Sequence, residues 1–454
     1  MKNYIVTCVI AAAALASCTQ TEDFTSQYNE KAKTMKFDVA YVGKNTRATG
    51  DLNTAGLASQ KLILWCDAYQ TPSTPETTPS TGMWISTQEP LYLSKSGSYW
   101  NVYKAAAAAE SDATDVNYPG STYTTYFTAI APASEFQEST GTGNQAKYSM
   151  GDQFTSSSTA PNFGNRKLTL DNIPVVQEVS NTEGSLKGID YLITCTTSTS
   201  EEVSLQFKHL LSKLRFAVWT DENTMATAGS ETTKIELNYL KVYLPTSGIA
   251  KYEQTKHDDV AGTWTWSGYT APTEANPTEL TNYKAYTLFD EGSESPAPMN
   301  ISYFADPTNA HDAANWSKVT LNGEPSFFIA PTGTNTGLKL YIDIQYTVKR
   351  KTGTDSEGNP TWSSSSTQGA KGYHVGHKEV TRNKMLVPVG DGSLGHGNET
   401  DADADAERNE GLSHFHQGVL ETLYICLRAD QLVKFSTDFQ VDGWKDDPID
   451  INQK

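Results

Sequence analysis

The stretch "MKFDVAYVGKNTRATGD", residues 35–51, opens with an alternation of large apolar side chains and smaller or polar ones. The large apolar side chains that share one face are Met35, Phe37, Val39 and Tyr41. Because a period of two is typical of a half-buried β-strand, we predict such a strand over residues 35–42. The alternation ends at Gly43, and the polar turn that follows contains Arg47. The stretch therefore predicts a core-facing strand joined directly to an exposed basic loop.

The composition favours a chain built from many short strands. At 454 residues, two or three domains are expected. Hydrophobic residues make up 37% and charged residues 19%, and 23 Tyr and 9 Trp accompany abundant Ser, Thr, Gly and Asn, which suits strands joined by polar turns. The formal net charge of −18 argues against a nucleic-acid partner, since binding phosphates requires a basic surface.

The N-terminus, "MKNYIVTCVIAAAALASC" (residues 1–18), has the pattern of an export signal. Its apolar run is too short for a permanent membrane span. Small residues before Cys18 form a lipobox-like site, which predicts a signal peptide over 1–17 and lipidation of Cys18. A lipidated Cys18 would tether the chain to a membrane without spanning it. An ordinary signal peptide with a chance cysteine is the alternative.

Strand-like segments recur along the chain and are separated by turns. No alternation of strands with helices is visible, which favours antiparallel sandwiches over a parallel sheet. Two regions rich in Gly, Pro, Thr and Asn, 251–323 and 351–372, are expected to be surface loops. The main predicted strands are 61–69, 83–93, 97–104, 125–132, 190–195, 203–220 (with a break around 209–212), 234–245, 326–331 and 338–350.

The C-terminal region repeats the pattern of the opening stretch. In "LVKFSTDFQVDGW" (432–444), the residues on one face are Val433, Phe435, Thr437, Phe439 and Val441. We therefore predict a second half-buried strand there. A further apolar strand is expected within "VLETLYICLRA", which begins at Val419.

No catalytic motif is recognisable in the sequence. A nucleophile elbow, a zinc-protease helix motif and a phosphate-binding glycine loop are all missing from it. The pairs His374/His377 and His414/His416 are more typical of loop histidines than of a metal site. "DADADAE" (401–407) lacks the glycine and the bidentate glutamate of a calcium loop, so a solvated acidic loop is expected, with a weak calcium site as the alternative. We therefore expect no enzyme activity, no metal and no cofactor.

The cysteines do not indicate a disulfide framework. Cys8 lies in the signal, and Cys18 is the lipidation site. Cys66, Cys195 and Cys426 remain, each in a strand-like apolar stretch. We expect them to be buried and inert, with one disulfide between two of them as the alternative.

The two matching strands lead to a hypothesis of strand exchange. A protease that cuts after Arg47 would release both the lipid anchor and the strand of 35–42. A sheet that loses a strand keeps an apolar groove with unpaired backbone groups, and refilling it is worth several kcal/mol at ~25 cal/mol per Å² of apolar area. The C-terminal strand of a second copy has the same alternation of two residues as the strand that was lost, so it can fill the groove. Such a head-to-tail contact does not close on itself, so it builds a filament.

The sequence also resembles the fimbrillins, the subunits of type V pili. The marks of this resemblance are the lipobox at 15–18, "NTRAT" around Arg47, "DYLIT" (190–194), "FKHLLSKLRFAV" (207–218) and the terminal strand that ends at Trp444. The motif FxHxLSKL is the most specific of them.

The resemblance implies an all-β fold of two tandem antiparallel β-sandwich domains with Greek-key, transthyretin-like topology. It implies a propeptide over 18–47, an N-terminal domain over 48–200 and a C-terminal domain over 201–454, with a donor-strand region at about 419–454. It further implies a palmitate-type lipid anchor in the cell outer membrane, processing between Arg47 and Ala48 by an arginine-specific protease, and an extracellular fimbrium that supports adhesion. The expected partners are other pilus subunits, and the surface receptor is left open.

Other roles remain open at this point. Family members also serve as pilus tips or anchors. A non-polymerising surface glycan-binding lipoprotein would instead present exposed aromatic residues, for which the candidates are Trp84, Trp100, Trp264 and Trp266. A secreted hydrolase would need carboxylates that converge in a cleft. Arg47 itself has the alternative of being an ordinary arginine in a surface turn.

Overall fold

The computed structural model describes most of the region between the two ends of the chain. The residues that it describes are 33–41, 54–72, 79, 82–85, 89–107, 112–151, 163–182, 185–221, 233–270, 282–291, 297–305, 309–310, 312–331, 338, 340–362, 375–377, 385–386, 415–427 and 433–438. The statements below concern these residues. They form β-strands almost throughout, which confirms the predicted all-β class at the level of secondary structure.

The first sheet has eight strands and contains both the opening strand and the strand whose last residues start the motif FxHxLSKL. Its order is β1-β13-β12-β6-β2-β4-β5, with β3 paired to β2. The strands are β1 (Lys36–Tyr41), β2 (Leu62–Gln70), β3 (Gly82–Trp84), β4 (Leu91–Ser96), β5 (Tyr99–Tyr103), β6 (Tyr123–Ala131), β12 (Leu192–Ser198) and β13 (Glu202–His209).

A five-stranded sheet covers one face of the eight-stranded sheet. Its strands, in order, are β17 (Gly262–Ser267), β16 (Ile249–Gln254), β9 (Leu168–Pro174), β8 (Ala146–Met150) and β7 (Phe136–Glu138). Trp65 and Ile130 of the larger sheet share a core with Leu170, Tyr148 and Tyr252 of the smaller one. We call these two sheets the first sheet pair.

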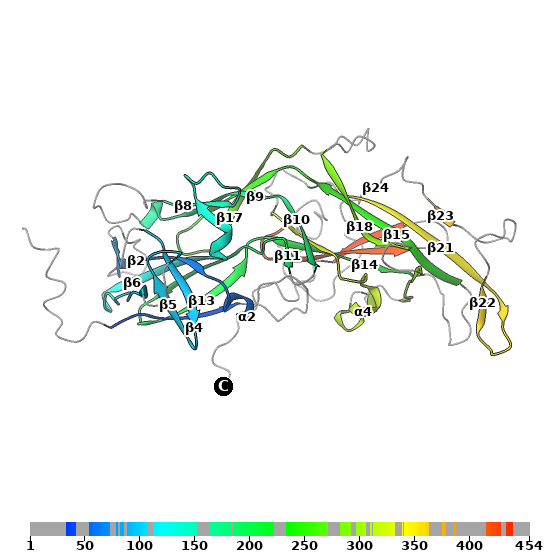
Figure 1. Ribbon diagram of the computed structural model, residues 1–454, viewed down its shortest axis with the longest axis horizontal. Coiled ribbons are helices and arrows are strands. Elements are labelled where there is room, and N and C mark those ends of the chain that lie inside the picture. Colours follow the sequence, from blue (N-terminus) through cyan, green and yellow to red (C-terminus); the bar gives the residue numbers. More distant parts are fainter. Residues whose placement is uncertain are drawn as a thin grey trace, which may run out of the picture.

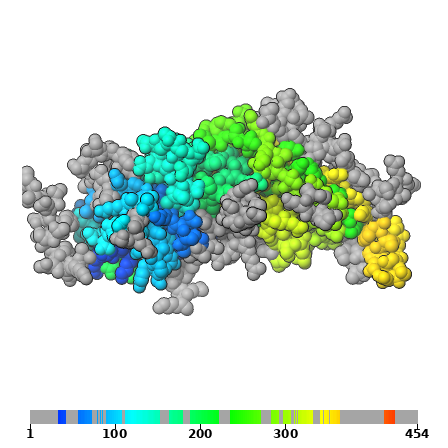
Figure 2. Space-filling model, viewed as in Figure 1, coloured from blue at the N-terminus to red at the C-terminus, as the bar shows by residue number. Residues whose placement is uncertain are grey.

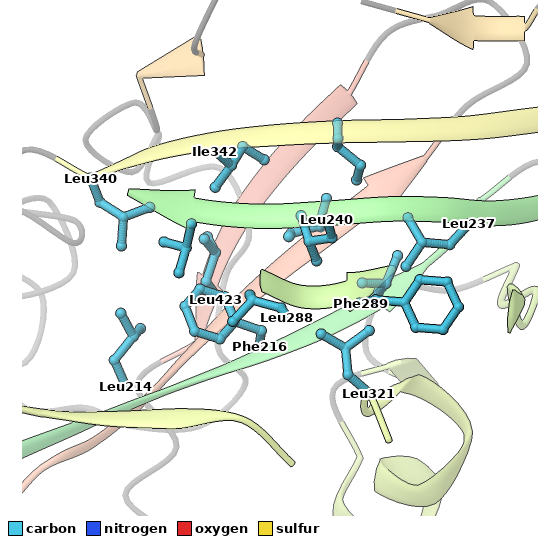
Figure 3. Close-up of a cluster of buried hydrophobic side chains, with 14 of the residues drawn as sticks. Leu214, Phe216, Leu237, Leu240, Leu288, Phe289, Leu321, Leu340, Ile342 and Leu423 are labelled. Atoms are coloured by element: carbon cyan, nitrogen blue, oxygen red, sulfur yellow. The ribbon is translucent and has the colours of Figure 1, made fainter. Parts of the chain in front are cut away.

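Two further sheets share a second large core, and we call them the second sheet pair. A six-stranded sheet contains, in order, β11 (Ser185–Lys187), β10 (Val176–Thr182), β20 (Ser326–Ile329), β14 (Ser212–Trp219), β25 (Leu420–Leu427) and β26 (Val433–Asp438). A seven-stranded sheet contains β18 (Tyr283–Asp290), β15 (Thr233–Pro245), β21 (Tyr341–Thr354) and β22 (Pro360–Trp362) in order, with β19 (Met299–Asn300) on β15 and with β23 (Val375–His377) and β24 (Met385–Leu386) on β21. Figure 3 shows Phe216, Leu240, Ile342 and Leu423 gathered between these sheets.

Helical structure is confined to single turns in the described residues. These turns are α2 (Thr54–Leu57), α4 (Trp316–Val319) and the 3-10 turns η2 (Ala133–Glu135), η3 (Phe163–Asn165) and η4 (Ala313–Asn315). No helix among the described residues is long and apolar enough to cross a membrane.

The molecule is elongated, and the two sheet pairs occupy its two halves (Figure 1). Strands β2, β4, β5 and β6 lie in one half, and β15, β18 and β21 lie in the other. In the space-filling view, the first third of the chain, in blue and cyan, fills one end, and the yellow β21–β22 hairpin projects from the other (Figure 2). The opening strand and the C-terminal strand therefore belong to different halves.

The sheets do not follow a single cut in the sequence. Strands β10 and β11 precede residue 200 but lie in the second sheet pair, whereas β16 and β17 follow it but lie in the first. The predicted domain division at 200/201 stays a prediction, and the strands show that the chain passes between the two halves several times.

Two expectations about the fold were wrong. The region 251–323 is not only surface loop, because it contains most of β16 together with β17, β18, β19 and α4, and 351–372 contains β22. These strands were missed because their threonine and glycine residues are typical of loops. Their inward side chains are aromatic, such as Trp264 of β17, which is 7% exposed. Pairing is also not uniformly antiparallel, since β1 with β13, β14 with β25 and β7 with β8 are parallel.

Candidate functional site at the N-terminal strand

The predicted N-terminal strand is part of the first sheet. Residues Lys36–Tyr41 form β1, and the side chains that the alternation placed on one face are buried. Met35, Phe37, Val39 and Tyr41 are 4–8% exposed and belong to one core cluster. Of the strand predicted over 35–42, the part Lys36–Tyr41 is therefore confirmed and its apolar face packs inward, while Val42 lies outside the described residues.

β1 lies beside β13, and the two strands run in the same direction. The register places Phe37 opposite Val203, Val39 opposite Leu205, and Tyr41 opposite Phe207. Because the inward residues of both strands share one cluster, the apolar face of β13 depends on β1 for part of its cover. Burying Met35, Phe37 and Val39 is worth roughly 5–9 kcal/mol in total, at about 1.5–3 kcal/mol for each fully buried side chain.

The start of β1 has backbone partners on both sides. On the β13 side, the Lys36 N–H donates to the Glu201 carbonyl at 2.8 Å. On the other side, the Met35 N–H donates to the Val116 carbonyl at 2.8 Å, and the Tyr118 N–H donates to the Lys33 carbonyl at 2.9 Å. A strand removed from this position would leave backbone groups without partners along two edges, and such groups are the usual basis of β-strand addition.

Two aromatic contacts fix the inward face of β1. The rings of Phe37 and Phe127 meet edge to face, with centroids 5.7 Å apart. The ring of Tyr41 lies in the same way against His209, at 4.8 Å. His209 is buried, and its Nδ1 lies 2.6 Å from Oδ1 of Asp190, which is also buried. The end of β1 therefore packs on a side-chain pair formed by the motifs DYLIT and FxHxLSKL.

The segment 207–214, FKHLLSKL, is a crossing between the two sheet pairs. Phe207, at the end of β13, lies in the core around β1. Leu210 and Leu211 lie in the core of the first sheet pair. Leu214, at the start of β14, lies in the core of the second. One short segment therefore reaches three cores, which explains why the predicted strand breaks near residue 210.

The C-terminal strands differ in how firmly they are held. β25 lies between β14 and β26, and all eight of its residues are buried. β26 is the last strand of its sheet and pairs antiparallel with β25. Val433, Phe435 and Thr437 belong to β26, whereas Phe439 and Val441 lie outside the described residues. Within the predicted donor region, β26 is therefore the strand at the edge of its sheet, whereas β25 has a neighbour on both sides.

Several predicted site residues lie outside the described part of the chain. Cys18, Arg47 and Ala48 are among them, and so is the acidic segment 401–407. In sequence, Arg47 falls between the end of β1 at Tyr41 and the start of α2 at Thr54. Lipidation, cleavage and any calcium binding at these positions stay predictions.

Two of the four tryptophans proposed for an aromatic glycan-binding platform are buried. Trp100 and Trp264 are buried, at 8% and 7% exposure. Trp266 is half-buried, and its ring N–H donates to the Pro331 carbonyl. Trp84 lies in β3, but its side chain is outside what the structure describes. The alternation of β5 and β17 turns Trp100 and Trp264 inward to fill the cores.

The histidines and cysteines are placed without a metal centre or a disulfide among the described residues. His377 lies in β23 and His416 precedes β25, while His374 and His414 lie outside the described part. The described residues contain no cluster of three His, Cys, Asp or Glu side chains that fits a metal ion. Cys66, Cys195 and Cys426 are free thiols, so the alternative of a disulfide between two of them was wrong.

A buried polar cluster in the first sheet pair was not predicted from the sequence. Nε of Arg166 lies 3.0 Å from Oδ2 of Asp67, and both side chains are almost fully buried. His257 donates from Nδ1 to the Arg166 carbonyl at 2.6 Å, and burial lowers the pKa of its imidazole. Because the Asp67 carboxylate is paired and shielded from solvent, this cluster is structural support between the two sheets.

A second buried carboxyl group, that of Glu421, lies at the start of β25. Ser212 donates its hydroxyl to Glu421 Oε1 at 3.2 Å, and the backbone N–H of His416 also bonds to this carboxyl. Burial raises the pKa of the Glu421 carboxyl well above its ordinary value of 4.5. The folded protein therefore keeps this proton at pH values where the unfolded chain has released it.

We expect the stability of the protein to fall as the pH rises above 4.5, the unfolded value for Glu421. The slope from this one proton reaches about 1.4 kcal/mol per pH unit until the folded pKa is passed. Glu421→Gln should flatten that fall, because the amide stays neutral. Thermal unfolding of both proteins from pH 5 to 8 measures the effect, with the exposed Glu253→Gln as the control. Parallel curves for the wild type and Glu421→Gln would rule out a proton held by Glu421.

Comparisons with known proteins give a likeness in structure only. No protein-family model matches the sequence, and no curated protein matches it. A "putative cell adhesion protein" of Bacteroides uniformis is similar over 91% of this chain and 100% of its own, with 13% identity and a TM-score of 0.34. One from Bacteroides ovatus shows 12% identity over 91% of this chain and 98% of its own, with a TM-score of 0.35.

A third such protein, from Parabacteroides distasonis, shows 9% identity over 90% of this chain and 97% of its own, with a TM-score of 0.35. Identities and TM-scores this low do not assign the chain to a family or to a function. Membership of the fimbrillins stays a prediction that rests on the sequence motifs.

Proposed function

We propose that this chain is the structural subunit of a cell-surface pilus that supports adhesion. In this proposal it is exported as a lipoprotein anchored through Cys18, cleaved after Arg47, and polymerised by donor-strand exchange. The observation that carries the proposal is β1, a strand whose apolar face is buried against β13 and whose chain continues into the segment that contains Arg47. Cutting that segment separates β1 from the remainder of the protein without interrupting any other strand that the structure describes.

The placement of the two strands supports a head-to-tail contact. β1 belongs to the eight-stranded sheet in one half of the molecule, and β26 belongs to the six-stranded sheet in the other (Figure 1). A contact between different patches of two copies is heterologous and leaves a free groove and a free strand at the ends. Repetition of that contact produces a filament.

The energetic balance favours exchange once the tether is cut. While β1 is covalently attached, its effective concentration at the groove prevents a second chain from competing. After cleavage, the strand of 35–41 is an independent peptide that leaves by diffusion. A strand that remains attached to a folded subunit can then replace it and restore both the buried apolar area and the backbone bonds.

The test is incubation of the purified full-length precursor with an arginine-specific protease. We expect the precursor to lose its N-terminal segment and to form a ladder of oligomers on a denaturing gel run without heating. A stable, nicked monomer that never forms oligomers would overturn the proposed function.

A further inference from the structure

The C-terminal strand resembles β1 in its alternation and shares a Lys-Phe pair with it. Residues 35–41 read MKFDVAY, and residues 433–439 read VKFSTDF. Lysine and phenylalanine are identical at the second and third positions, and the apolar positions of both segments fall on the same face. The two segments can therefore be aligned without a gap, with residue 433 matched to residue 35 and residue 439 matched to residue 41.

The groove of β1 has positions that suit this register. Phe37 packs on Phe127, and in the proposed match Phe435 takes its place with the same ring. Val39 is replaced by Thr437, which has nearly the same shape. The positions of Met35 and Tyr41 go to Val433 and Phe439, and Phe439 keeps an aromatic ring where Tyr41 contacts His209.

The polar edge of the strand fits as well. Lys36 lies opposite Glu202 in the parallel register of β1 and β13. Lys434 takes the same place and keeps a positive charge beside that carboxylate. A register shifted by two residues would instead put Thr437 against Phe127 and Val441 at the place of Tyr41, which removes both aromatic contacts.

We infer that residues 433–439 of a second copy enter the groove parallel to β13, with Val433 at the place of Met35 and Phe439 at the place of Tyr41. This inference rests on the proposed function and specifies its joint. It also requires β26 to separate from β25, the strand with which it pairs in the free subunit. The exchange therefore moves the strand from the edge of one sheet to the edge of another, where the N–H at the place of Met35 also has the Val116 carbonyl as a partner.

Disulfide trapping in the full-length chain tests this register. Asp38 lies opposite Ser204 on the exposed side of the strands, so the inference places Ser436 of the donor next to Ser204 of the acceptor. Paired strands bring Cα atoms into the range that a disulfide requires. In a free subunit Ser204 and Ser436 belong to different sheets, so a bond between them must join two copies.

We expect the double variant Ser204→Cys, Ser436→Cys to give, after cleavage and oxidation, a ladder that survives heating and collapses when reductant is added. The matched control is Ser204→Cys with Asp438→Cys, which should form the same non-covalent ladder but no covalent one. A covalent ladder in the control alone would show a register shifted by two residues. Absence of covalent bonds in both variants, with the non-covalent ladder intact, would overturn the parallel register but not the proposed function. Absence of any ladder in wild type and variants would overturn both.

Discussion

Replacing Arg47 with alanine should abolish both processing and polymerisation. Arg47 is the single site for an arginine-specific protease between β1 and α2, because the sequence of this connection contains no second arginine. With the connection intact, β1 stays in its sheet and the groove stays filled. The variant should be recovered as a lipidated monomer with the stability of the wild type. Gel analysis without heating and N-terminal sequencing measure the outcome.

A matched control comes from the same connection. Lys44→Ala removes the neighbouring positive charge and should leave processing and the ladder unchanged. Polymers formed by Arg47→Ala at the wild-type level would show that the strand is released by a cut elsewhere or that it is not released at all. Either result would show that cleavage after Arg47 is not required for polymerisation.

Replacing Phe435 with aspartate should block donation while leaving cleavage intact. At the place of Phe37, the carboxylate would face Phe127 in an apolar core, and burying an unpaired charge is far more costly than the gain from one strand. We expect loss of the homopolymer and accumulation of a monomer that begins at Ala48. Ser436→Asp, on the opposite side of the strand, is the control and should polymerise.

Mixing the two proteins separates a donation defect from misfolding. A Phe435→Asp subunit retains its own β1 groove, so it should accept the strand of a wild-type subunit and end the chain there. Added in increasing proportion, it should shorten wild-type ladders. A variant that neither accepts nor donates has lost its fold, and a variant that polymerises alone contradicts the role given to Phe435.

The strands with clear alternation were predictable from the sequence. Residues 35–41 bury the face that the pattern indicated, and the break near residue 210 coincides with the crossing from β13 to β14. These features depend on local periodicity, which survives any tertiary arrangement. The apolar segments that became β2 and β25 were recognisable for the same reason.

Other features depend on contacts between segments that are distant in sequence. The parallel direction of β1 beside β13 could not be read from alternation, because parallel and antiparallel edge strands share a period of two. The pairing of Asp67 with Arg166 joins residues 99 positions apart, and the contact of Asp190 with His209 is equally invisible to a pattern search. Strands β16 to β18 were missed because their exposed residues have the composition of loops.

The central claim is that a strand from a second copy replaces β1 in the groove, and the composition of the polymer tests it. Filaments made by arginine-specific cleavage of the wild-type precursor should be purified away from free peptide, dissociated, and weighed by mass spectrometry. We predict subunits that begin at Ala48 and contain no copy of residues 36–41, with one such peptide released into solution for each joint formed. Filaments that retain residues 36–41 in every subunit would contradict strand replacement and require another basis for assembly.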